Sequence, residues 1–346
     1  CVIRVSAQLT PQGVSEGVSV KRTEASARTA TVVGSHQGRV RVGVIGAGVF
    51  GGYHAQKFAS SFHSEFVGVF DLNQEAAGKV VAKVGKGEVF SSFEAIAAVC
   101  DALVIATPAS SHAMLTRKAL EAGKHALVEK PLALTGVEAR QLAKMALERD
   151  LVLSVGHQER LVFEAMGLFA TGERPKRVEA VRMGPASPDG RCEDVSVVFD
   201  LMIHDLDLAA ELFGGDVKGT DGEGYSAHTR LLDHAAAELH FANHGHAKLT
   251  ASRCAEKRER WMKIEYASGI VEIDQGVLTA HVTGHRKCAR RRYGLEAGDV
   301  GERRYEDFVT RTESGGSQRE MQRGRPRTHA DHGPRVRAAH KVHLVH

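Results

Sequence analysis

The stretch Val40-Arg-Val-Gly-Val-Ile-Gly-Ala-Gly-Val-Phe-Gly51 decides the fold of this chain. Its first half is a short apolar run of the kind that forms a buried β-strand. Its second half places glycines at 46, 48 and 51, directly after the strand and at the start of a predicted helix. A strand, this glycine pattern and a helix in that order are typical of the first βα unit of a dinucleotide-binding domain.

Each glycine of the pattern has its own role in such a domain. Gly46 allows a tight turn, Gly48 lets the backbone approach a pyrophosphate, and Gly51 lets the helix pack closely on the strand. The first residues of the helix, Val49 and Phe50, offer free backbone N–H groups to phosphate oxygens. The five residues together form the predicted nucleotide-binding loop.

An acidic residue follows at the spacing that this motif requires. The next predicted strand, residues 65–70, is followed by Asp71, 20 residues after Gly51. A carboxylate at that position binds the ribose hydroxyls of the adenosine. The next two residues are Leu72 and Asn73, so no arginine stands there to bind a 2′-phosphate. The sequence therefore predicts NAD as the cofactor, in preference to NADP.

Predicted strands and helices alternate up to residue 155, which predicts βαβ units and a parallel sheet. After Gly156 the pattern changes to a helix over residues 199–213, ended by Gly214. Four strand-like runs joined by hairpin turns follow, and they predict an antiparallel meander. These runs are residues 235–241, 247–252, 261–266 and 270–273.

The predicted fold class is therefore α/β, with an N-terminal Rossmann parallel sheet and a C-terminal α+β domain whose open sheet is largely antiparallel. Residues 1–38 are expected to form a leader without regular structure. The NAD-binding Rossmann domain is expected over residues 39–156 and the α+β domain over residues 157–284. From residue 285 to residue 346 no helical or strand period is sustained, which predicts a basic, irregular tail.

Composition excludes several classes of protein. With 42% hydrophobic and 25% charged residues among 346, the chain is neither collagen-like nor wholly disordered. Its formal net charge of +4 originates in the tail, where 15 Lys and Arg residues face 8 acidic ones, against 31 and 34 in residues 1–284. The body of the chain is thus mildly acidic, and its charge gives no reason to expect a nucleic-acid partner. The sequence contains no run of about eighteen apolar residues, so no membrane-spanning helix is predicted.

The five cysteines are widely spaced and form no CxxC pair. Such a set indicates reduced thiols and a cytoplasmic protein, without a disulfide framework or a zinc site. The leader is rich in Ser and Arg but lacks the apolar core of a signal peptide. A transit peptide fits this composition, although we favour a leader without regular structure or an added extension.

Three further segments carry residues that suit the oxidation of an alcohol. They are Ala106-Thr107-Pro108 with His112 beyond it, Glu129-Lys130-Pro131, and Asp200-Leu-Met-Ile-His204. The oxidation of a secondary alcohol removes the hydroxyl proton while a hydride leaves the same carbon, and histidine is the usual proton acceptor.

The last two segments supply a candidate base and two charged groups. Asp200 and His204 are four residues apart, which places both on one face of the predicted helix. The carboxylate of Asp200 would then orient the imidazole of His204 or hold the substrate hydroxyl. Lys130 would stabilise negative charge that develops on the reacting oxygen.

In this order after the glycine pattern, the segments resemble the Gfo/Idh/MocA family of oxidoreductases. The resemblance covers residues 39–275 and includes Gly156-His-Gln-Glu-Arg160, which is similar to the segment that joins the two domains in that family. It implies a nicotinamide-dependent dehydrogenase of sugars, inositols or related carbonyl compounds, whose second domain binds substrate and forms a homo-oligomer. Lys130, Asp200 and His204 match the catalytic trio of the family. The positions that line the nicotinamide ribose are matched by Thr107, Pro108, His112 and Glu129.

Residues 194–207 look most like the branch of the family that oxidises the 3-hydroxyl of UDP-N-acetylglucosamine. This resemblance implies a UDP-sugar between the domains, with Arg160 and Arg182 as candidates to contact the diphosphate. An inositol or free-sugar dehydrogenase is the alternative, as is a non-catalytic sugar- or nucleotide-sensing regulator. Beyond the meander, Arg290-Arg-Arg292 stands where the family has an apolar helix, so this element is either lost or altered.

Three other clusters carry residue types that occur in metal or nucleic-acid sites. His204, Asp205 and Asp207 supply too few ligands for a metal. His240, His244 and His246 are expected on alternating faces of a hairpin, so we expect no metal site there either. Arg323-Gly-Arg-Pro-Arg327 resembles the core of an AT-hook, yet it is short and isolated, and no nucleic-acid or membrane partner is expected.

Overall fold

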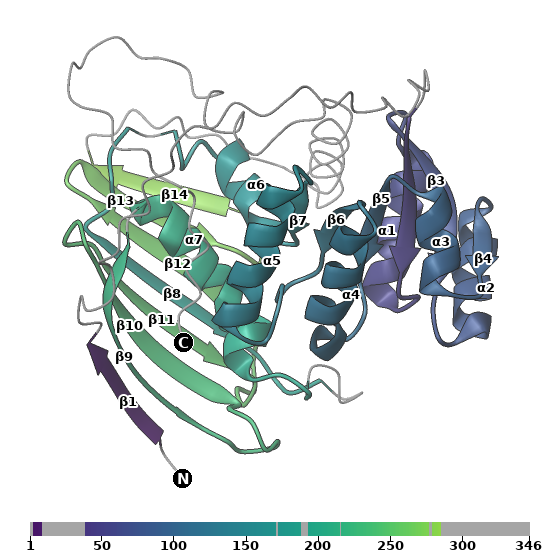
Figure 1. Ribbon diagram of the computed structural model, residues 1–346. Coiled ribbons are helices and arrows are strands. Elements are labelled where there is room, and N and C mark those ends of the chain that lie inside the picture. The colour runs from purple at the N-terminus through teal and green to yellow at the C-terminus, as the bar shows by residue number, and fades with distance from the viewer. Residues whose placement is uncertain are drawn as a thin grey trace, which may run out of the picture.

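The computed structural model describes residues 3–8, 39–170, 172–187, 193–214, 216–276 and 279–284. They form two domains side by side, each built on one β-sheet (Figure 1). Most of the predicted leader, the whole predicted tail and the AT-hook-like segment lie outside the described residues. Within the described part, no helix has both the length and the apolar character that a membrane span requires.

The first domain has a six-stranded sheet in which all neighbouring strands are parallel, in the order β4-β3-β2-β5-β6-β7. This arrangement confirms the predicted Rossmann sheet. The strand order reverses between β2 and β5, and ligands of such sheets bind outside the carboxyl ends of the strands at that point. The strands are β2 (Val40–Ile45), β3 (Ser64–Phe70), β4 (Glu88–Phe90), β5 (Ala102–Ile105), β6 (His125–Val128) and β7 (Leu153–Val155).

Helices cover both faces of this sheet, and most of them begin at a capping side chain. Asn73, Ser92 and Thr135 each accept a hydrogen bond from the backbone N–H three residues later, which stabilises a helix start. Helix α1 instead begins after Gly48 without a side-chain cap, so its first N–H groups stay available. The helices are α1 (Val49–Ser60), α2 (Gln74–Val84), α3 (Phe93–Val99), α4 (Ala109–Glu121) and α5 (Gly136–Glu148).

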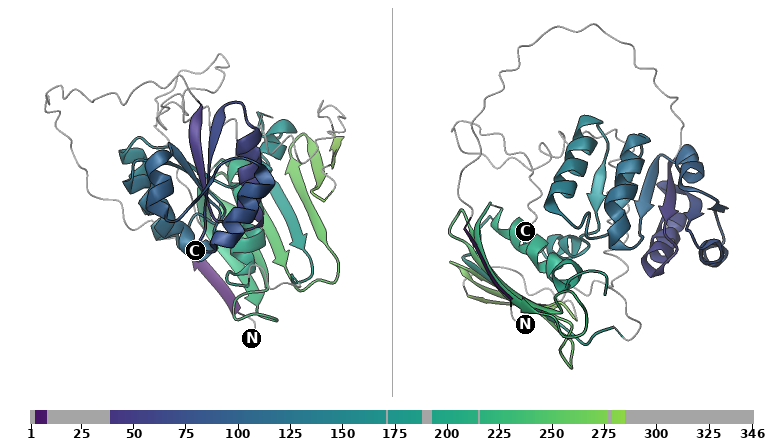
Figure 2. Two further views of the ribbon diagram at one scale, coloured as in Figure 1. Left: turned by 90° about the vertical axis from the view of Figure 1, so that its right-hand side faces the viewer. Right: turned by 60° about the horizontal axis from the view of Figure 1, so that its bottom comes forward.

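The second domain has an eight-stranded sheet in the order β1-β9-β10-β11-β8-β12-β13-β14. Among the described strands of this sheet, only β11 and β8 pair in parallel, so the sheet is largely antiparallel, as predicted. Helix α6 (Glu159–Ala165), the π-helical turn η1 (Val198–Met202) and helix α7 (Ile203–Phe213) lie on the face toward the first domain (Figure 2). The strands are β1 (Ile3–Gln8), β8 (Arg177–Met183), β9 (Val217–Tyr225), β10 (His234–Phe241), β11 (His246–Ser252), β12 (Glu259–Tyr266), β13 (Gly269–Asp274) and β14 (Thr279–Gly284).

The structure corrects three sequence predictions about this sheet. It is not a simple meander, because β8 lies between β11 and β12. Strand β9 was not predicted, because its sequence, VKGTDGEGY, has three glycines and no alternation of apolar and polar residues. Strand β1 falls within the leader predicted to lack regular structure and pairs with β9.

The fourth correction concerns the histidines of the hairpin between β10 and β11. His240 and His246 are direct cross-strand partners, and their rings lie side by side with centroids 5.0 Å apart. The expectation that they point to different faces is wrong, because faces alternate along one strand whereas directly opposed residues of paired strands share a face.

A buried ion pair fixes the segment that leads into β10. The Oδ2 atom of Asp233 accepts hydrogen bonds from the backbone N–H groups of Ala227, His228 and Thr229 at 2.7–2.9 Å. Its Oδ1 atom accepts one from Nε of Arg253 at 2.6 Å. Burial raises the pKa of Asp233, but these hydrogen bonds, led by the one from Thr229, outweigh burial and hold the pKa below its usual value.

We predict that Asp233→Ala lowers the free energy of unfolding by about 3 kcal/mol, because it leaves a buried guanidinium and three N–H groups without their acceptor. Since the folded-state pKa of Asp233 is lowered, its contribution is present above about pH 4, the unfolded-state value, and is lost as the pH falls through the folded-state value. Urea denaturation at neutral and acidic pH measures both effects. The exposed control Glu256→Ala should change the free energy by less than about 0.5 kcal/mol, and an equal loss in both variants would contradict the prediction.

Candidate active site

The predicted functional segments meet at the carboxyl edge of the Rossmann sheet. Parallel strands place their carboxyl ends at one edge, so each segment that follows a strand lies beside the next. Backbone hydrogen bonds of 2.8–2.9 Å join these segments to the neighbouring strands: Gly46 N to Phe70 O, Ala106 N to Ile45 O, Glu129 N to Ile105 O, and Gly156 N to Val128 O.

The glycine loop leaves open space where the sequence predicts a phosphate. Gly46 has a φ of +104°, and a Cβ atom there would lie 2.5 Å from the carbonyl oxygen of Ala106. A Cβ atom on Gly51 would overlap the carbonyl oxygen of Gly46, whereas one on Gly48 would meet nothing within 4 Å. Packing within the chain therefore requires glycine at 46 and 51, while the space at Gly48 is open to a ligand. This cradle fits the diphosphate of a dinucleotide.

The surroundings of the loop also fit a dinucleotide. Asp71 accepts hydrogen bonds from the N–H groups of Ala47 at 2.6 Å and Asn73 at 2.7 Å, so its carboxylate sits beside the loop as predicted from the spacing. Val49 is 56% and Phe50 is 44% exposed. Exposed apolar groups at the uncapped end of α1 are surfaces that a bound cofactor can cover.

His112 joins two of the loops at this edge. Its buried ring has Nδ1 2.7 Å from the carbonyl oxygen of Pro131 and Nε2 2.8 Å from that of Thr107. The resemblance places His112 and Thr107 at the nicotinamide ribose, together with Pro108. In the structure both ring nitrogens of His112 contact backbone oxygens, so its direct role is to hold the loop after β5 against the cis peptide Lys130-Pro131.

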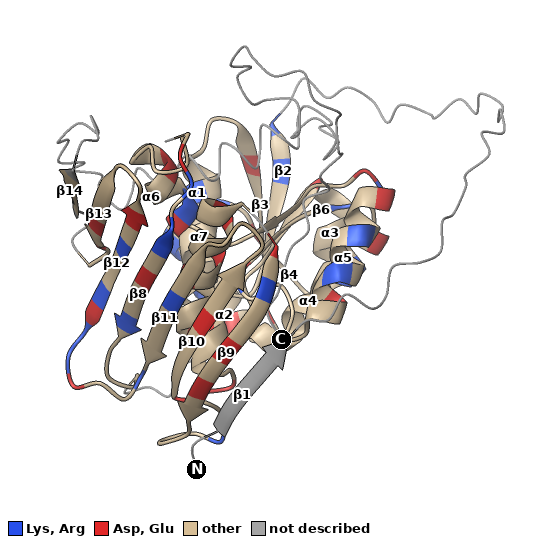
Figure 3. Ribbon diagram, turned by 90° about the vertical axis from the view of Figure 1, so that its left-hand side faces the viewer, with Lys and Arg blue, Asp and Glu red and all other residues tan. Residues whose placement is uncertain are grey.

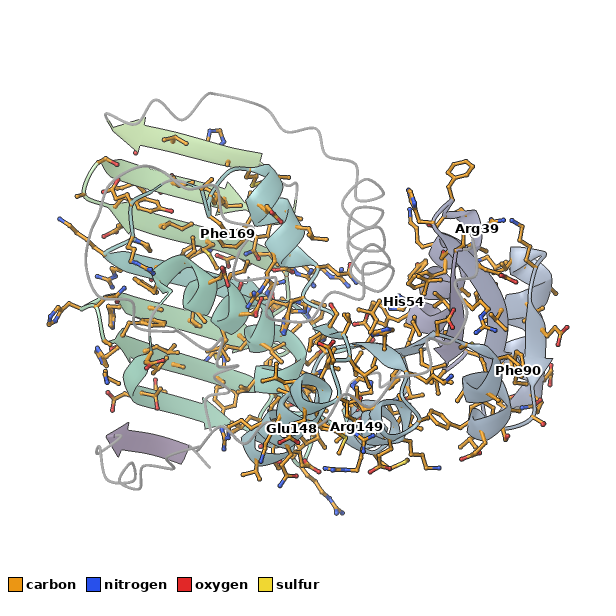
Figure 4. All side chains as sticks on the ribbon, turned by 45° about the horizontal axis from the view of Figure 1, so that its top comes forward. Arg39, His54, Phe90, Glu148, Arg149 and Phe169 are labelled. Atoms are coloured by element: carbon orange, nitrogen blue, oxygen red, sulfur yellow. The ribbon has the colours of Figure 1, made fainter. Side chains whose placement is uncertain are left out.

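His54 is a site residue that the sequence analysis missed. Its Nε2 atom lies 2.8 Å from Oε1 of Glu129, and both side chains are buried. In Figure 4 His54 lies on the side of the first domain that faces the second domain. Gly51, Ala55 and Phe58 form the buried stripe of α1, and a histidine within an apolar stripe was the signal available. The contact fixes the carboxylate of Glu129 directly before Lys130.

Lys130 reaches across to the second domain. Its Nζ atom donates hydrogen bonds to the backbone oxygen of Asp200 at 2.8 Å and to Oδ1 of Asp200 at 3.2 Å. Both side chains are largely buried. Asp200 lies in the π-helical turn, which interrupts the regular α-helical hydrogen bonds and leaves its carbonyl open to the lysine. The structure thus brings together two of the three predicted catalytic residues.

His204 lies in the same region but with a different carboxylate than expected. Its Nδ1 atom lies 3.7 Å from Oε1 of Glu159, whereas Asp200 interacts with Lys130. Residues four apart share a face in an α-helix, but the turn over Val198–Met202 is π-helical, which alters that relation. Among the described residues, then, the carboxylate nearest to the imidazole belongs to Glu159 at the start of α6.

Burial and positive charge keep the imidazole of His204 neutral. Burial lowers the pKa of His204 well below its usual value, and the charges of Arg182, Lys130, His157 and Arg260 lower it further. A neutral imidazole can accept a proton from a substrate hydroxyl. The site therefore holds a cationic donor, Lys130, and a neutral acceptor, His204.

The two arginines proposed for a diphosphate are both engaged elsewhere. Arg160 donates two hydrogen bonds to Asp207, at 2.5 and 2.6 Å, and one to Glu211 at 3.1 Å. Arg182 is fully buried and donates to Glu159, Asp205 and Gln275. Carboxylates of α6 and α7 thus already neutralise both arginines, so a role for either one at a diphosphate stays a prediction.

Two family models match this chain. Residues 40–157 match the model of an oxidoreductase family with an NAD-binding Rossmann fold, and residues 173–272 match that family's C-terminal domain. The chain belongs to the Gfo/Idh/MocA family of oxidoreductases. This result confirms the resemblance drawn from the glycine pattern and the three later segments.

Several Gfo/Idh/MocA relatives have named activities. UDP-N-acetylglucosamine 3-dehydrogenase of Acidithiobacillus ferrooxidans is 39% identical over 244 residues, which are 70% of this chain and 76% of that protein. A solved structure of the same enzyme, GnnA, has a TM-score of 0.73 and 36% identity over 80% of this chain and 89% of its own. Inositol 2-dehydrogenase of Rhizobium meliloti is 31% identical over 51% of this chain and 55% of that protein. These relatives of the chain are thus dehydrogenases named for sugar or inositol substrates.

The lowered pKa of His204 gives a prediction that needs no substrate. In an NMR titration, the ring signals that disappear in His204→Gln should show no protonation near pH 6.5, because burial and nearby cations oppose the charged form. A normal titration for His204 would show that burial and the nearby cations do not disfavour the charged form of its imidazole.

Proposed function

We propose that this chain oxidises a secondary hydroxyl of a sugar or nucleotide sugar with NAD, and that the 3-hydroxyl of UDP-N-acetylglucosamine is its target. The observation that supports this most directly is the contact between Lys130 and Asp200, which joins the edge of the NAD-binding domain to the second domain. The 39% identity to a UDP-N-acetylglucosamine 3-dehydrogenase supports the choice of substrate. Inositol oxidation is the alternative, because inositol dehydrogenases also match this chain.

The cofactor site of this proposal consists of the glycine loop and the strand ends around it. The N–H groups at the start of α1 would bind the diphosphate, and Asp71 would bind the adenosine ribose. We propose NAD because a carboxylate at this position repels a 2′-phosphate and no arginine follows it. Residues proposed to hold the cofactor are Gly46, Gly48, Val49, Phe50, Gly51, Asp71, Thr107, Pro108, His112 and Glu129.

In the proposed mechanism each charged group has a separate task. Bound NAD supplies the hydride acceptor. Lys130 donates a hydrogen bond to the reacting oxygen and stabilises its developing negative charge. His204, kept neutral by burial, accepts the hydroxyl proton. Asp200 holds the Lys130 ammonium in place through two oxygens.

Two arginines that form no ion pair with a described residue support an anionic substrate. Arg260 is the cross-strand partner of Arg182, and its backbone oxygen accepts a hydrogen bond from Gln275, whose side chain contacts Arg182. Met262 and Ile264 follow Arg260 by two and four residues along β12 and are buried in the core. Residues two apart share a face of a strand, so Arg260 lies on the side of the sheet that faces α7. Neither Arg258 nor Arg260 forms an ion pair with a described residue.

This arrangement supports the nucleotide sugar over the inositol as the proposed substrate. Burial and the nearby charge of Arg182 lower the pKa of Arg260, and the charges of Glu159 and Asp205 offset this only in part. An anion bound there would therefore relieve the remaining unfavourable interactions between cations. A UDP-sugar carries a diphosphate that can provide this charge. An inositol carries none, so the free guanidinium groups favour the nucleotide sugar.

The decisive test is NADH formation with purified chain, NAD and a panel of UDP-sugars, free hexoses and inositols. We expect turnover with UDP-N-acetylglucosamine, and we expect Lys130→Met to lower kcat about 100-fold or more while NAD binding changes less than twofold. The control Lys144→Met replaces an exposed lysine of α5 and should retain full activity. Turnover of an inositol alone would overturn the substrate, and full activity of Lys130→Met would overturn the mechanism. NAD and sugar binding without turnover would indicate the regulator.

Arg260→Gln tests the anionic part of the substrate. The variant should raise KM for UDP-N-acetylglucosamine and the inhibition constant of UDP by about tenfold, because a charge-assisted hydrogen bond to the diphosphate is lost. Its Kd for NAD should stay the same. The exposed Arg230→Gln, in the same domain, is the matched control. Equal KM values in both variants would show that Arg260 does not contact the diphosphate.

A further inference from the structure

The open face of the large sheet carries a cluster that the proposed oxidoreductase does not use. Figure 3 views the sheet from the side opposite to α6 and α7, where charged residues form bands along the strands. Leu239 and Ala247 point into the core on the other side, so residues next to them in sequence lie on this open face. The cluster consists of Glu238 and His240 on β10, His246 on β11 and Asp221 on β9.

The register of the strands brings these side chains together. His240 is directly opposite His246, and Glu238 is directly opposite Asp221. Since residues two apart on one strand share a face, all four side chains project from the same side of the sheet. A register shift between β9 and β10 at His240 and Phe241 adds local twist beside the cluster.

The distances suit a small cation. The potential ligand atoms of Glu238, His240 and His246 all lie within 4.8 Å of one another. Nε2 of His246 is 3.4 Å from Oε2 of Glu238, and Nε2 of His240 is 3.7 Å from Oδ2 of Asp221. Ligand atoms around a tetrahedral zinc ion are about 3.4 Å apart, given bond lengths of about 2.1 Å. Small side-chain rotations are enough to reach that geometry.

We propose that Glu238, His240 and His246 bind a divalent transition metal, with zinc as the best-fitting ion and Asp221 beside the fourth coordination position. Two imidazoles and a carboxylate form a donor set typical of zinc, whereas magnesium and calcium require oxygen ligands. Lys248 lies opposite Glu238 on the same face, but no ion pair joins the two within the described residues. The proposal does not depend on the activity of the dehydrogenase site.

The bound ion would join the two strands of the β10–β11 hairpin and stabilise the folded chain, because binding to the folded state alone raises stability by mass action. It would also compete with protons, since imidazoles must be deprotonated to bind a metal. Zinc should therefore raise the melting temperature at pH 7.5 more than at pH 5.5.

The test is a zinc titration of the full chain against a chromogenic chelator. Because the chain contains 19 histidines, the readout is the difference between variants. We expect the double variant His240→Gln/His246→Gln to bind one zinc ion fewer per chain than the unsubstituted protein, and Glu238→Gln to bind at this site at least tenfold more weakly. Cobalt bound in place of zinc should give the visible absorption of a tetrahedral site only when both histidines are present.

The matched control is His244→Asn. It removes the histidine from the turn between the two ligand histidines, and Asn tolerates the positive φ of 63° at that position. This variant should keep the full zinc stoichiometry and the increase in melting temperature. Circular dichroism of the metal-free variants verifies that all of them are folded. The proposal is overturned if the double variant binds as much zinc as the control, or if zinc leaves the melting temperature of the unsubstituted protein unchanged.

Discussion

The arrangement of the second domain depends on how the buried charge of Arg182 is neutralised. A lone guanidinium in the interior would cost several kcal/mol, so its carboxylate partners cannot move apart without a large penalty. Burial lowers the pKa of Arg182, but Asp205 and Glu159 outweigh burial and raise it above its usual value. The requirement for these partners holds β8 against α6 and α7.

This constraint extends to the proposed catalytic residues. Asp205, which accepts a hydrogen bond from Arg182, directly follows His204 on α7. Glu159 also accepts a hydrogen bond from Arg182, and its Oε1 atom lies 3.7 Å from Nδ1 of His204. The side chains that neutralise Arg182 therefore also determine where the imidazole lies. Arg182 remains close enough to disfavour a second positive charge on that ring. One buried arginine thus contributes both to the packing of the domain and to the protonation state of the base.

The sequence was sufficient to predict features encoded over short distances. The glycine pattern, Asp71 and the strand ends gave the Rossmann sheet, because each depends on a few consecutive residues. The partners of Arg182 could not be predicted from the sequence, because they lie 23 and 93 residues away and no local pattern joins them to Arg182. The π-helical turn before His204 was also missed, because its composition is compatible with an ordinary helix. Strand β9 forms despite its glycines through pairing with β10, which is a tertiary effect.

The contact of Lys130 with Asp200 has a consequence for tolerance to mutation. The shorter of its two hydrogen bonds goes to a backbone oxygen, which every amino acid possesses. Substitution of the side chain at 200 would remove the carboxylate yet leave an acceptor for the ammonium group. The contact between the two domains therefore depends partly on the main chain. A substitution at position 200 can change the chemistry of the site while the lysine keeps its backbone acceptor.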